Sequence, residues 1–550
     1  MKTFLFIILS LFVSIVIRIV LPWSNIIGST IKYNTVDAYY FVHLAELYPN
    51  IPLRDYSLGY PDGLPISVPL WSQIIGFIGN VEFTAVILPA ILGVLSVIPV
   101  FFIAKAILSQ KLAVVVTLFY SIMGGDLLIR TQLGAADHHA LELFAFLYTM
   151  MFVVLFTQNK KWYWLLGAVS FFVLYFFAWA GWYVIPAIIL LFMLWQVSQN
   201  IKGNIPIIAF VCCGIFGISL ITIIMPDFYS WLSEKLIVIS WNPLSTIVEE
   251  QPLLVANGRF ETGVLWGQYG IVFYIALLGL GAFAYKYYRE RKPIDLLFLA
   301  WTFIVLILAF AQRRFTMYLS LNLIILAVYF AFVLVKILPK QKMLIAVGLV
   351  ILVVFPMIST SVNQVTDKRA LITEGWVEVT QWLSWNAFLE KNTPNDWCGN
   401  KYMADWESFK HKNEYADYGV LSLWNYGYWI VQQGNSNAYN TPGSDNNRKR
   451  ATEALLTTDE QWVADMMYTD NLRYIVIDGT MVTSKFNSMA RILNLKDSEF
   501  FIDDNYKNTM VYRLYYGDTF SWFNKVFESE SQIKINGSMY SEVVIWERHE

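Results

Sequence analysis

Charge and cysteine are both scarce in this sequence of 550 residues. Only 15% of the residues are charged, and the 39 basic and 41 acidic side chains leave a formal net charge of −2. Because there is no basic excess, a nucleic-acid-binding protein is not expected. Of the three cysteines, Cys212 and Cys213 are adjacent in an apolar run and Cys398 stands alone. The sequence therefore contains neither a disulfide framework nor a zinc-binding cysteine pattern.

Apolar residues, in contrast, make up 57% of the chain, far more than in an ordinary soluble domain. Apolar runs of roughly 16 to 22 residues, near the length that crosses hydrocarbon, recur about eleven times before residue 360. They lie at 3–21, 82–104, 112–130, 140–157, 162–179, 182–197, 205–225, 264–285, 294–312, 315–337 and 343–359. We therefore expect a multi-pass protein of the cell membrane, embedded in a lipid bilayer.

Lysine and arginine lie in alternate loops between these runs, and short loops rich in basic residues are typically cytoplasmic. The residues concerned are Lys105, Lys111, Lys160, Lys161, Lys202, the run 286–292, Lys336, Lys340 and Lys342. The opposite side then receives loop 22–82, the turn around Asp137, loop 226–264 and the segment 361–550. This predicts a transmembrane catalytic domain over 1–360, which includes both loops, and an extracytoplasmic globular domain over 361–550.

The segment 361–550 is more polar and alternates strand-like and helix-like patterns. Residues 473–478 (RYIVID) are typical of a short buried strand, and apolar residues at three-to-four spacing predict a helix after Gly479. On such a helix Asp478, Met481 and Lys485 would lie close to one face. A strand leading into a helix indicates an α/β domain.

Polar residues at the outer ends of the runs are candidate site residues. The stretch 130–139 (RTQLGAADHH) places Asp137 and His139 at i, i+2, a pair that can close on one cation. Oxygen and imidazole together favour Mn²⁺ or Zn²⁺ over Mg²⁺. The alternative is a helix cap with interfacial polar residues.

Three further candidates are Asp37 in TVDAYY, Glu249 in STIVEE and Arg314 in QRRFTMY. Each has a simpler interpretation, as a solvated carboxylate or as an arginine that reaches the membrane interface. Together with the Asp/His pair on the same predicted side, they indicate a metal-assisted site for an anionic leaving group.

In this order, the polar stretches resemble the oligosaccharyltransferase catalytic subunit family, most closely its archaeal type (dolichyl-phosphooligosaccharide–protein glycotransferase). The matching stretches span nearly the whole chain and are 37–40 (DAYY), 130–139, 246–249 (TIVE), 314–318 (RFTMY), 392–394 (NTP), 418–430 (YGVLSLWNYGYWI) and 478–489. The resemblance implies a polytopic α-helical membrane domain of about 11–13 transmembrane helices, followed by a C-terminal α/β extracytoplasmic domain.

The resemblance also implies an activity: inverting transfer of a preassembled oligosaccharide from a dolichyl-(di)phosphate carrier to asparagine in Asn-x-Ser/Thr sequons. It implies that Asp37 and Glu249 are catalytic and that Asp37, Asp137, His139 and Glu249 hold a divalent cation, Mn²⁺ or Mg²⁺, with Zn²⁺ as an alternative. His138 and Arg314 are then expected near the donor phosphate. The partners are the lipid-linked donor and acceptor polypeptides, and a single subunit is expected to act alone.

In the family a W-W-D-Y-G-like motif binds the Ser or Thr of the sequon. Here that motif reads Leu423, Trp424 and Asn425, so an indole and a carboxylate are missing, and weaker or altered selection of the hydroxyl is expected. Asp478, Met481 and Lys485 are expected to close the same pocket. The alternatives are an aromatic core turn without a binding role, another polyprenyl-phosphate-dependent glycosyltransferase with a non-sequon acceptor, or a transporter or receptor.

Overall fold

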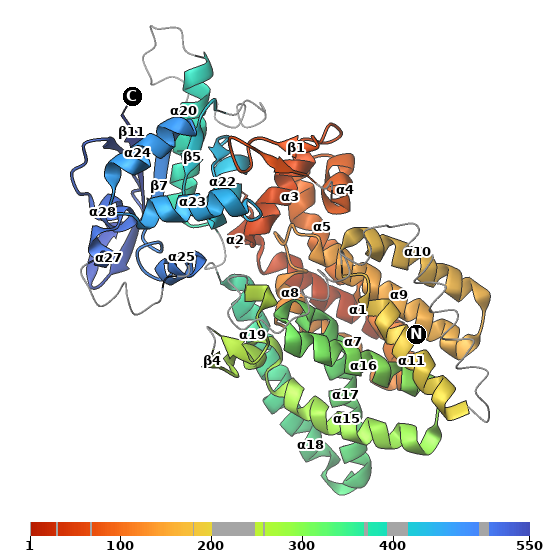
Figure 1. Cartoon of the computed structure of the whole chain (residues 1–550). Helices are drawn as coiled ribbons and strands as arrows, with labels where there is room; N and C mark the ends of the chain where they lie inside the picture. Colours follow the sequence, from red (N-terminus) through yellow and green to blue (C-terminus); the bar gives the residue numbers. More distant parts are fainter. Residues whose placement is uncertain are drawn as a thin grey trace. The chain divides into compact units, whose positions relative to one another are not determined.

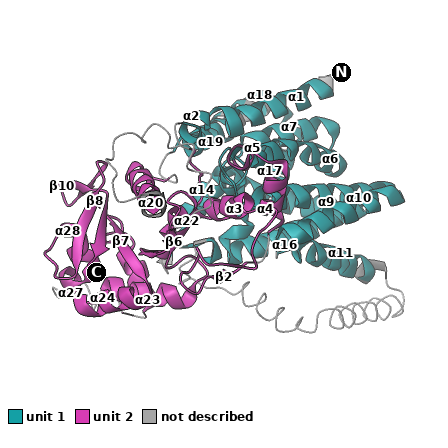
Figure 2. Cartoon of the chain, turned by 90° about the horizontal axis from the view of Figure 1, so that it is seen from above, with its two compact units in different colours: residues 1–30, 86–367 teal, residues 31–85, 368–550 magenta. Residues whose placement is uncertain are grey.

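The computed structural model describes residues 2–28, 31–66, 69–179, 181–200, 248–256, 259–367, 372–392, 416–493, 495 and 505–549. The predicted run 205–225, Thr246 and Ile247 of the TIVE stretch, and most of the NTP stretch lie outside these residues. Two compact units make up the chain (Figure 2): unit 1 is Met1–Thr30 with Val86–Asp367, and unit 2 is Ile31–Ala85 with Lys368–Glu550.

Unit 1 consists mainly of apolar helices (Figure 1). Among the described residues, six helical spans are long and apolar enough to cross a membrane: Thr3–Ile26, Val81–Ile107, His139–Asn159, Ile271–Glu290, Pro293–Ala311 and Arg313–Ile337. Four shorter apolar helices are Gln110–Ile122, Trp162–Ala178, Val184–Val197 and Ile351–Thr366. Each of these ten spans overlaps a predicted run, and the expected polytopic helical fold is confirmed.

The described elements of unit 1 are mostly helices. They are α1 (Lys2–Ile15), η1 (Val16–Val20), α2 (Trp23–Ile26), α5 (Val81–Leu95, which runs across the division), α6 (Val97–Ile107), α7 (Gln110–Ile122), α8 (Asp126–Ile129), α9 (His139–Asn159), α10 (Trp162–Ala178), α11 (Val184–Asn200), η2 (Val248–Glu250), β3 (Val255–Ala256), β4 (Arg259–Phe260), α14 (Gly263–Tyr269), α15 (Ile271–Glu290), α16 (Pro293–Ala311), η3 (Arg313–Phe315), α17 (Thr316–Ile337), η4 (Pro339–Gln341), α18 (Lys342–Leu349), η5 (Val350–Val354) and α19 (Phe355–Thr366).

Glycine interrupts two of the predicted runs. The sequence predicts one helix over 112–130, whereas α7 ends at Ile122 and α8 begins only at Asp126, after Gly125 with a φ of 74°. A side chain disfavours a positive φ, so glycine at this position allows the turn that leads into α8. The run 264–285 is likewise divided between α14 and α15 at Gly270, where φ is 54°. A polar loop over residues 130–138 then connects α8 to α9.

Unit 2 contains a five-stranded mixed sheet in the order β6-β5-β7-β11-β8. Strands β6, β5 and β7 pair in parallel, whereas β11 is antiparallel to both β7 and β8. The elements are α3 (Val36–Glu46), β1 (Arg54–Asp55), β2 (Leu64–Pro65), α4 (Leu70–Ile78), α20 (Glu374–Asn392), β5 (Gly419–Leu421), η6 (Trp424–Tyr426), α22 (Gly427–Gln432), β6 (Asn437–Ala438), α23 (Asp445–Leu456), α24 (Glu460–Thr469), β7 (Leu472–Asp478), α25 (Phe486–Ile492), α27 (Asn505–Asn508), α28 (Met510–Tyr516), β8 (Phe523–Glu528), β9 (Gln532–Ile535), β10 (Ser538–Ser541) and β11 (Val543–Arg548). The predicted α/β character of the C-terminal segment is confirmed.

Most of the first predicted outer loop, 22–82, groups with the C-terminal segment, although the sequence-based division places it in the membrane domain. The reason lies in the packing of α3 on α22. Tyr39 meets Trp429 edge-on with ring centroids 6.1 Å apart, and Gln432 Nε2 donates to Glu46 Oε1 at 3.1 Å. Hydrophobic and polar contacts together therefore fix the loop helix to the aromatic segment.

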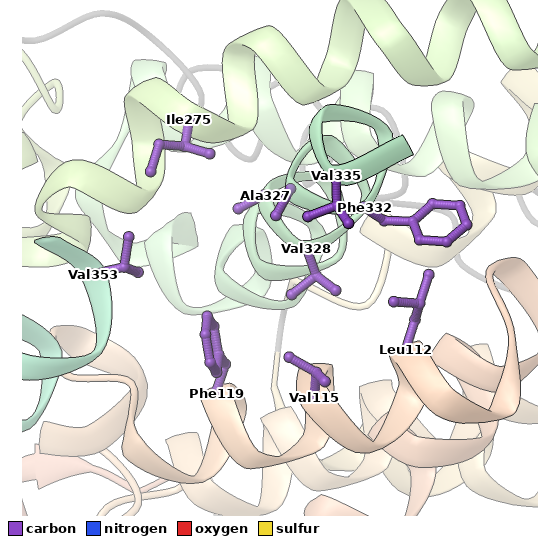
Figure 3. Close-up of a pocket in the computed structure, with 10 residues that line it drawn as sticks. Leu112, Val115, Phe119, Ile275, Ala327, Val328, Phe332, Val335 and Val353 are labelled. Atoms are coloured by element: carbon purple, nitrogen blue, oxygen red, sulfur yellow. The ribbon is translucent and has the colours of Figure 1, made fainter. Parts of the chain in front are cut away.

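An apolar crevice of about 250 Å³ lies within unit 1 (Figure 3). Its walls come from α7, α15, α17 and η5, through residues such as Phe119, Ile275, Val328 and Val353. Since nearly all of the lining is hydrocarbon, the crevice suits apolar groups rather than ordered water.

Gly279 allows α15 to approach α17 closely, because a Cβ at this position would lie 2.7 Å from the carbonyl carbon of Leu326. Small residues commonly permit such contacts between membrane helices. We expect Gly279→Leu to destabilise the detergent-purified chain by about 1–3 kcal/mol, the usual cost of overpacking, and to lower its melting temperature. Gly281→Leu on the same helix is the matched control, since a Cβ there meets no atom within 4 Å. Equal melting temperatures for the two variants would contradict this packing.

Candidate metal centre and acceptor site

The loop between α8 and α9 brings together Asp137, His138 and His139. Each offers one ligand atom, and these atoms lie within 4.8 Å of one another, a spacing that suits a single cation. Asp137 and His139 are buried and His138 is partly buried. One carboxylate and two imidazoles fit Mn²⁺ or Zn²⁺ better than Mg²⁺. His138, which the resemblance places near the donor phosphate, thus lies beside the predicted pair.

Mutual attraction sets the charges in this group. Burial acts to raise the pKa of Asp137, but the neighbouring His139 and His138 outweigh it and hold that pKa well below the ordinary value. Burial acts to lower the pKa of His138, but Asp137, whose Oδ1 lies 2.5 Å from Nδ1, raises it to about 9. Asp137 is therefore ionised, which is the form in which a carboxylate binds a metal.

Glu142 orients His139 from one turn further along α9. Its Oε2 lies 2.9 Å from His139 Nδ1, and its Oε1 accepts a hydrogen bond from the Tyr318 hydroxyl. Tyr318 in turn lies 3.1 Å from the hydroxyl of Tyr175. A carboxylate on the far nitrogen of a histidine is a common outer partner of a metal ligand. Sequence reasoning missed Glu142, although its i, i+3 spacing from His139 was a usable signal.

Glu249 reaches the same group from the turn η2. Its Oε2 lies 4.0 Å from His139 Nε2, and its Oε1 accepts a 2.7 Å hydrogen bond from Arg130 Nη2. Burial acts to raise the pKa of Glu249, but the charge of Arg130 outweighs it, so the pKa is lowered. Glu249 is therefore an ionised carboxylate beside Asp137 and His139. Arg130 was part of a quoted stretch but had no predicted role.

Arg314 lies in η3, directly before α17. Its Nη2 donates to Glu250 Oε1 at 3.0 Å, so the predicted phosphate-binding arginine is paired with the neighbour of Glu249. The two turns are also joined through the backbone, because Arg313 N donates to Gln251 O at 3.0 Å. Arg314 and Glu249 are therefore positioned by the same pair of turns.

Asp37 belongs to unit 2, whereas Asp137, His139, Glu249 and Arg314 belong to unit 1. It is exposed in the first turn of α3, after the N-cap Thr35, whose hydroxyl accepts from Ala38 N at 3.3 Å. Its participation in the same metal site stays a prediction.

Within unit 2, the charge of Asp37 acts on Tyr428 of α22. Burial and then the charge of Asp37 raise the pKa of Tyr428. Tyr428 packs against Tyr40, with ring centroids 5.1 Å apart. The helix that presents Asp37 is therefore held by the segment that follows the W-W-D-like motif.

The three motif residues themselves form a tightly packed turn. Leu423 is 1% exposed and Trp424 is 9% exposed, whereas Asn425 in the same turn is less buried. Gly427 is required by close approach, since a Cβ there would lie 2.5 Å from Thr441 Cγ2. Asn425 is therefore the most accessible of the three motif residues.

The sequence predicted that the other three pocket residues lie close to one helix face. This placement is wrong. Asp478 ends β7, Met481 lies in the following turn, and Lys485 is the N-cap of α25. The helix starts late because Asp478 Oδ1 accepts from Thr480 N at 2.8 Å and from Met481 N at 3.0 Å, which forms a turn instead.

The Tyr426 hydroxyl brings Asp478 and Lys485 together: it donates to Asp478 Oδ2 and accepts from Lys485 Nζ. Trp376 Nε1 donates to the same Oδ2 at 2.9 Å. Burial lowers the pKa of Lys485, although Asp478 opposes this shift. Sequence reasoning treated Tyr426 as core and missed Trp376. The signal that could have identified this group is a set of polar side chains in a chain that has few charges.

Comparison with known proteins identifies relatives over most of the chain. Residues 52–248 match the family model described as oligosaccharyl transferase STT3, N-terminal. Dolichyl-phosphooligosaccharide-protein glycotransferase 3 from Archaeoglobus fulgidus is 22% identical over 87% of this chain and 69% of its own length.

Two solved structures share the fold. The oligosaccharyltransferase AglB from Archaeoglobus fulgidus, in complex with an inhibitory peptide and a dolichol-phosphate, gives a TM-score of 0.80 at 17% identity and covers 100% of this chain and 88% of that one. The complex of the Archaeoglobus fulgidus oligosaccharyltransferase with zinc and sulfate gives a TM-score of 0.73 at 17% identity and covers 99% and 88%.

The fold and the site define a polytopic membrane protein with a metal-competent helical unit and an α/β globular domain. Residues 52–248 match the oligosaccharyl transferase STT3 family, and the fold of the chain is that of the archaeal oligosaccharyltransferases, in line with the resemblance seen in the sequence.

Removing the charge of Glu142 tests its support of His139. We expect Glu142→Gln to weaken Mn²⁺ binding to the purified chain roughly 10- to 100-fold, as loss of an outer partner of a metal ligand usually does. Calorimetric titration with Mn²⁺ alone measures this affinity. Glu290→Gln is the control, because Glu290 forms an exposed pair with Lys292 at 2.6 Å that contributes little. Unchanged affinity in folded Glu142→Gln would refute the role.

Proposed function

We propose that this protein transfers a preassembled oligosaccharide from a dolichyl-(di)phosphate carrier to the asparagine amide of Asn-x-Ser/Thr sequons, with inversion. The observation that carries the proposal is the grouping of Asp137, His138, His139 and Glu249 at one end of a helical membrane unit. The packing of the Asp37 helix on the aromatic turn in unit 2 supports it. The structure of Archaeoglobus fulgidus AglB contains an inhibitory peptide and a dolichol-phosphate, which supports a peptide acceptor and a lipid-linked donor.

A divalent cation fits this donor set. Asp137, His139 and Glu249 would hold it, with Asp37 as the proposed further ligand. His138 would lie next to the cation, because its Nδ1 contacts Asp137 Oδ1. When bound, the cation would fix the carboxylates and polarise the bond between the sugar and the phosphate. Mn²⁺ suits the mixed oxygen and nitrogen donors, and Mg²⁺ and Zn²⁺ are the alternatives.

The chain's own residues must activate a poor nucleophile. The nitrogen lone pair of an amide is delocalised into its carbonyl, so Asp37 and Glu249 are proposed to accept the two amide hydrogens and weaken that conjugation. As the bond between nitrogen and the anomeric carbon forms, the bond from that carbon to the phosphate oxygen breaks and a carboxylate takes the amide proton. Arg314 and His138 are proposed to stabilise the charge on the departing phosphate.

The site is proposed to lie on the extracytoplasmic side, together with the globular domain. Support comes from the basic loops, which alternate with the site-bearing ones. For example, the exposed cations Arg291 and Lys292 lie between α15 and α16, whereas Arg314 follows the opposite end of α16. The η2 turn lies at that same end, because Arg313 N donates to Gln251 O. The chain is proposed to act as a single subunit.

Asp37→Asn tests the proposed catalytic carboxylate. The amide keeps the shape of the side chain but loses its charge, so turnover of a sequon peptide with a lipid-linked glycan is expected to fall roughly 100-fold or more. Asp62→Asn, which neutralises another exposed carboxylate of unit 2, is expected to leave turnover unchanged. Wild-type turnover in Asp37→Asn would contradict the catalytic role.

Asn425→Asp tests hydroxyl selection. A carboxylate accepts a stronger hydrogen bond than an amide oxygen does, so restoring it is expected to raise the preference for Asn-x-Thr over Asn-x-Ala peptides roughly tenfold, the equivalent of about 1.4 kcal/mol. The measurement is the ratio of kcat/KM for the two peptides. Asn524→Asp introduces the same charge on the edge strand β8 and serves as the control.

Equal turnover of Asn-x-Thr and Asn-x-Ala by the unmodified chain, unchanged in Asn425→Asp, would refute the sequon pocket. That result would favour a polyprenyl-phosphate-dependent glycosyltransferase with a non-sequon acceptor, the alternative raised by the motif departures at Leu423 and Asn425.

A further inference from the structure

Arg18 is a fully buried cation inside the candidate membrane span Thr3–Ile26, where a charged side chain is costly. It lies in η1, a π-helical turn of the kind often found at functional sites. Its Nη1 donates to Ser14 Oγ at 3.0 Å and to Ser121 O at 3.0 Å. Among the described residues its hydrogen-bond partners are thus hydroxyl and carbonyl oxygens, so an ion pair does not account for the arginine.

Two further contacts connect Arg18 with the loop between α8 and α9. Arg18 Nε donates to Thr131 Oγ1 at 3.1 Å, and the carbonyl oxygen of Arg18 accepts from Leu133 N at 2.8 Å. Thr131 directly follows Arg130, whose guanidinium binds Glu249. The first membrane helix therefore holds the segment that carries the metal-competent residues.

Helix α5 holds the other side of this segment. A Cβ on Gly93 would lie 2.7 Å from both Cβ and the carbonyl oxygen of Thr131, and 3.1 Å from Arg18 Cδ. Gly134 N donates to Val86 O at 3.0 Å, and Gly134 has a φ of 80°. With little space to shift, the loop keeps the path that Arg18 and α5 impose on it.

From this geometry we infer that Arg18 is a positioning residue for the metal site. Acting through Thr131 and Leu133, it fixes the loop so that Asp137 and His139 can hold one cation together with Glu249, although it contacts none of them. This inference rests on the metal site of the proposed function. An outer residue that orients ligands changes metal affinity by roughly 10- to 100-fold when it is removed.

Three variants test this role. Thr131→Val removes the hydroxyl that accepts from Arg18 and nearly preserves its volume. Arg18→Met removes every donor of the guanidinium and keeps a long side chain. Ser10→Ala is the matched control, because Ser10 is also buried on the first helix and its hydroxyl donates to Phe6 O at 3.0 Å, away from the loop.

The full-length chain in detergent is titrated with Mn²⁺ alone, and sequon-peptide glycosylation is measured as a function of Mn²⁺ and of peptide. Thr131→Val and Arg18→Met are expected to raise the Mn²⁺ dissociation constant roughly tenfold or more. The double variant is expected to lose less affinity than the sum of the two single variants, since both changes remove the bond between Arg18 and Thr131. The KM for peptide of Thr131→Val and Arg18→Met is expected to stay at the wild-type value, which a general loss of structure would not allow. The Mn²⁺ affinity of the control Ser10→Ala is also expected to equal that of the wild type.

Wild-type Mn²⁺ affinity in folded Thr131→Val and Arg18→Met overturns the inference, and Thr131→Val decides alone if Arg18→Met does not fold. A wild-type chain that binds no Mn²⁺ overturns the metal site of the proposed function as well. Binding by the wild type with unaffected variants removes only the role of Arg18.

Discussion

A charge buried at the end of an apolar helical unit is unfavourable unless another group pairs with it, and the site in unit 1 follows from this requirement. His139 is paired by Glu142, Glu142 is also bound by Tyr318, and Arg130 is paired by Glu249. Each pair except the first joins different elements: α9 with α17, and the loop with η2. The positions of the candidate ligands therefore depend on helix packing as much as on the ligands themselves, since a shift of α17 would release the carboxylate that orients His139.

In unit 2, the same requirement is met at Asp478, where both carboxylate oxygens accept hydrogen bonds from the protein. Its Oδ1 accepts from the backbone of Thr480 and Met481, and its Oδ2 accepts from Tyr426 and Trp376. A carboxylate with donors on both oxygens has little capacity left for a substrate hydroxyl. Asp478 is thus better explained as the group that fixes the Tyr426 hydroxyl, the end of β7 and the turn before α25. The polar side chain left accessible on the aromatic turn is Asn425.

The sequence predicted the helical spans well, because long apolar runs have few alternative structures. It predicted β7 to within one residue, and it placed Asp137 and His139 together because they are neighbours in the chain. It could not predict contacts between distant elements. Hydropathy alone treated Arg18 as one more residue of an apolar run. Spacing alone extended a helix back to Asp478, because the side chain that forms the competing turn is recognisable only once its backbone partners are known. The metal group was predictable, whereas the residues that hold it came from tertiary structure.

The substitution at Leu423 changes less than the motif suggests. Its side chain is buried in unit 2, so it fills core volume rather than a substrate-facing surface. An indole still packs on the turn, because Trp376 of α20 lies 4.2 Å from the Tyr426 ring, but its N–H is bound to Asp478. The turn thus keeps aromatic packing through a residue distant in sequence, and that indole offers no free donor. Whatever selection this turn exerts on a hydroxyl then depends on the amide of Asn425, a neutral acceptor where the family has a charged one.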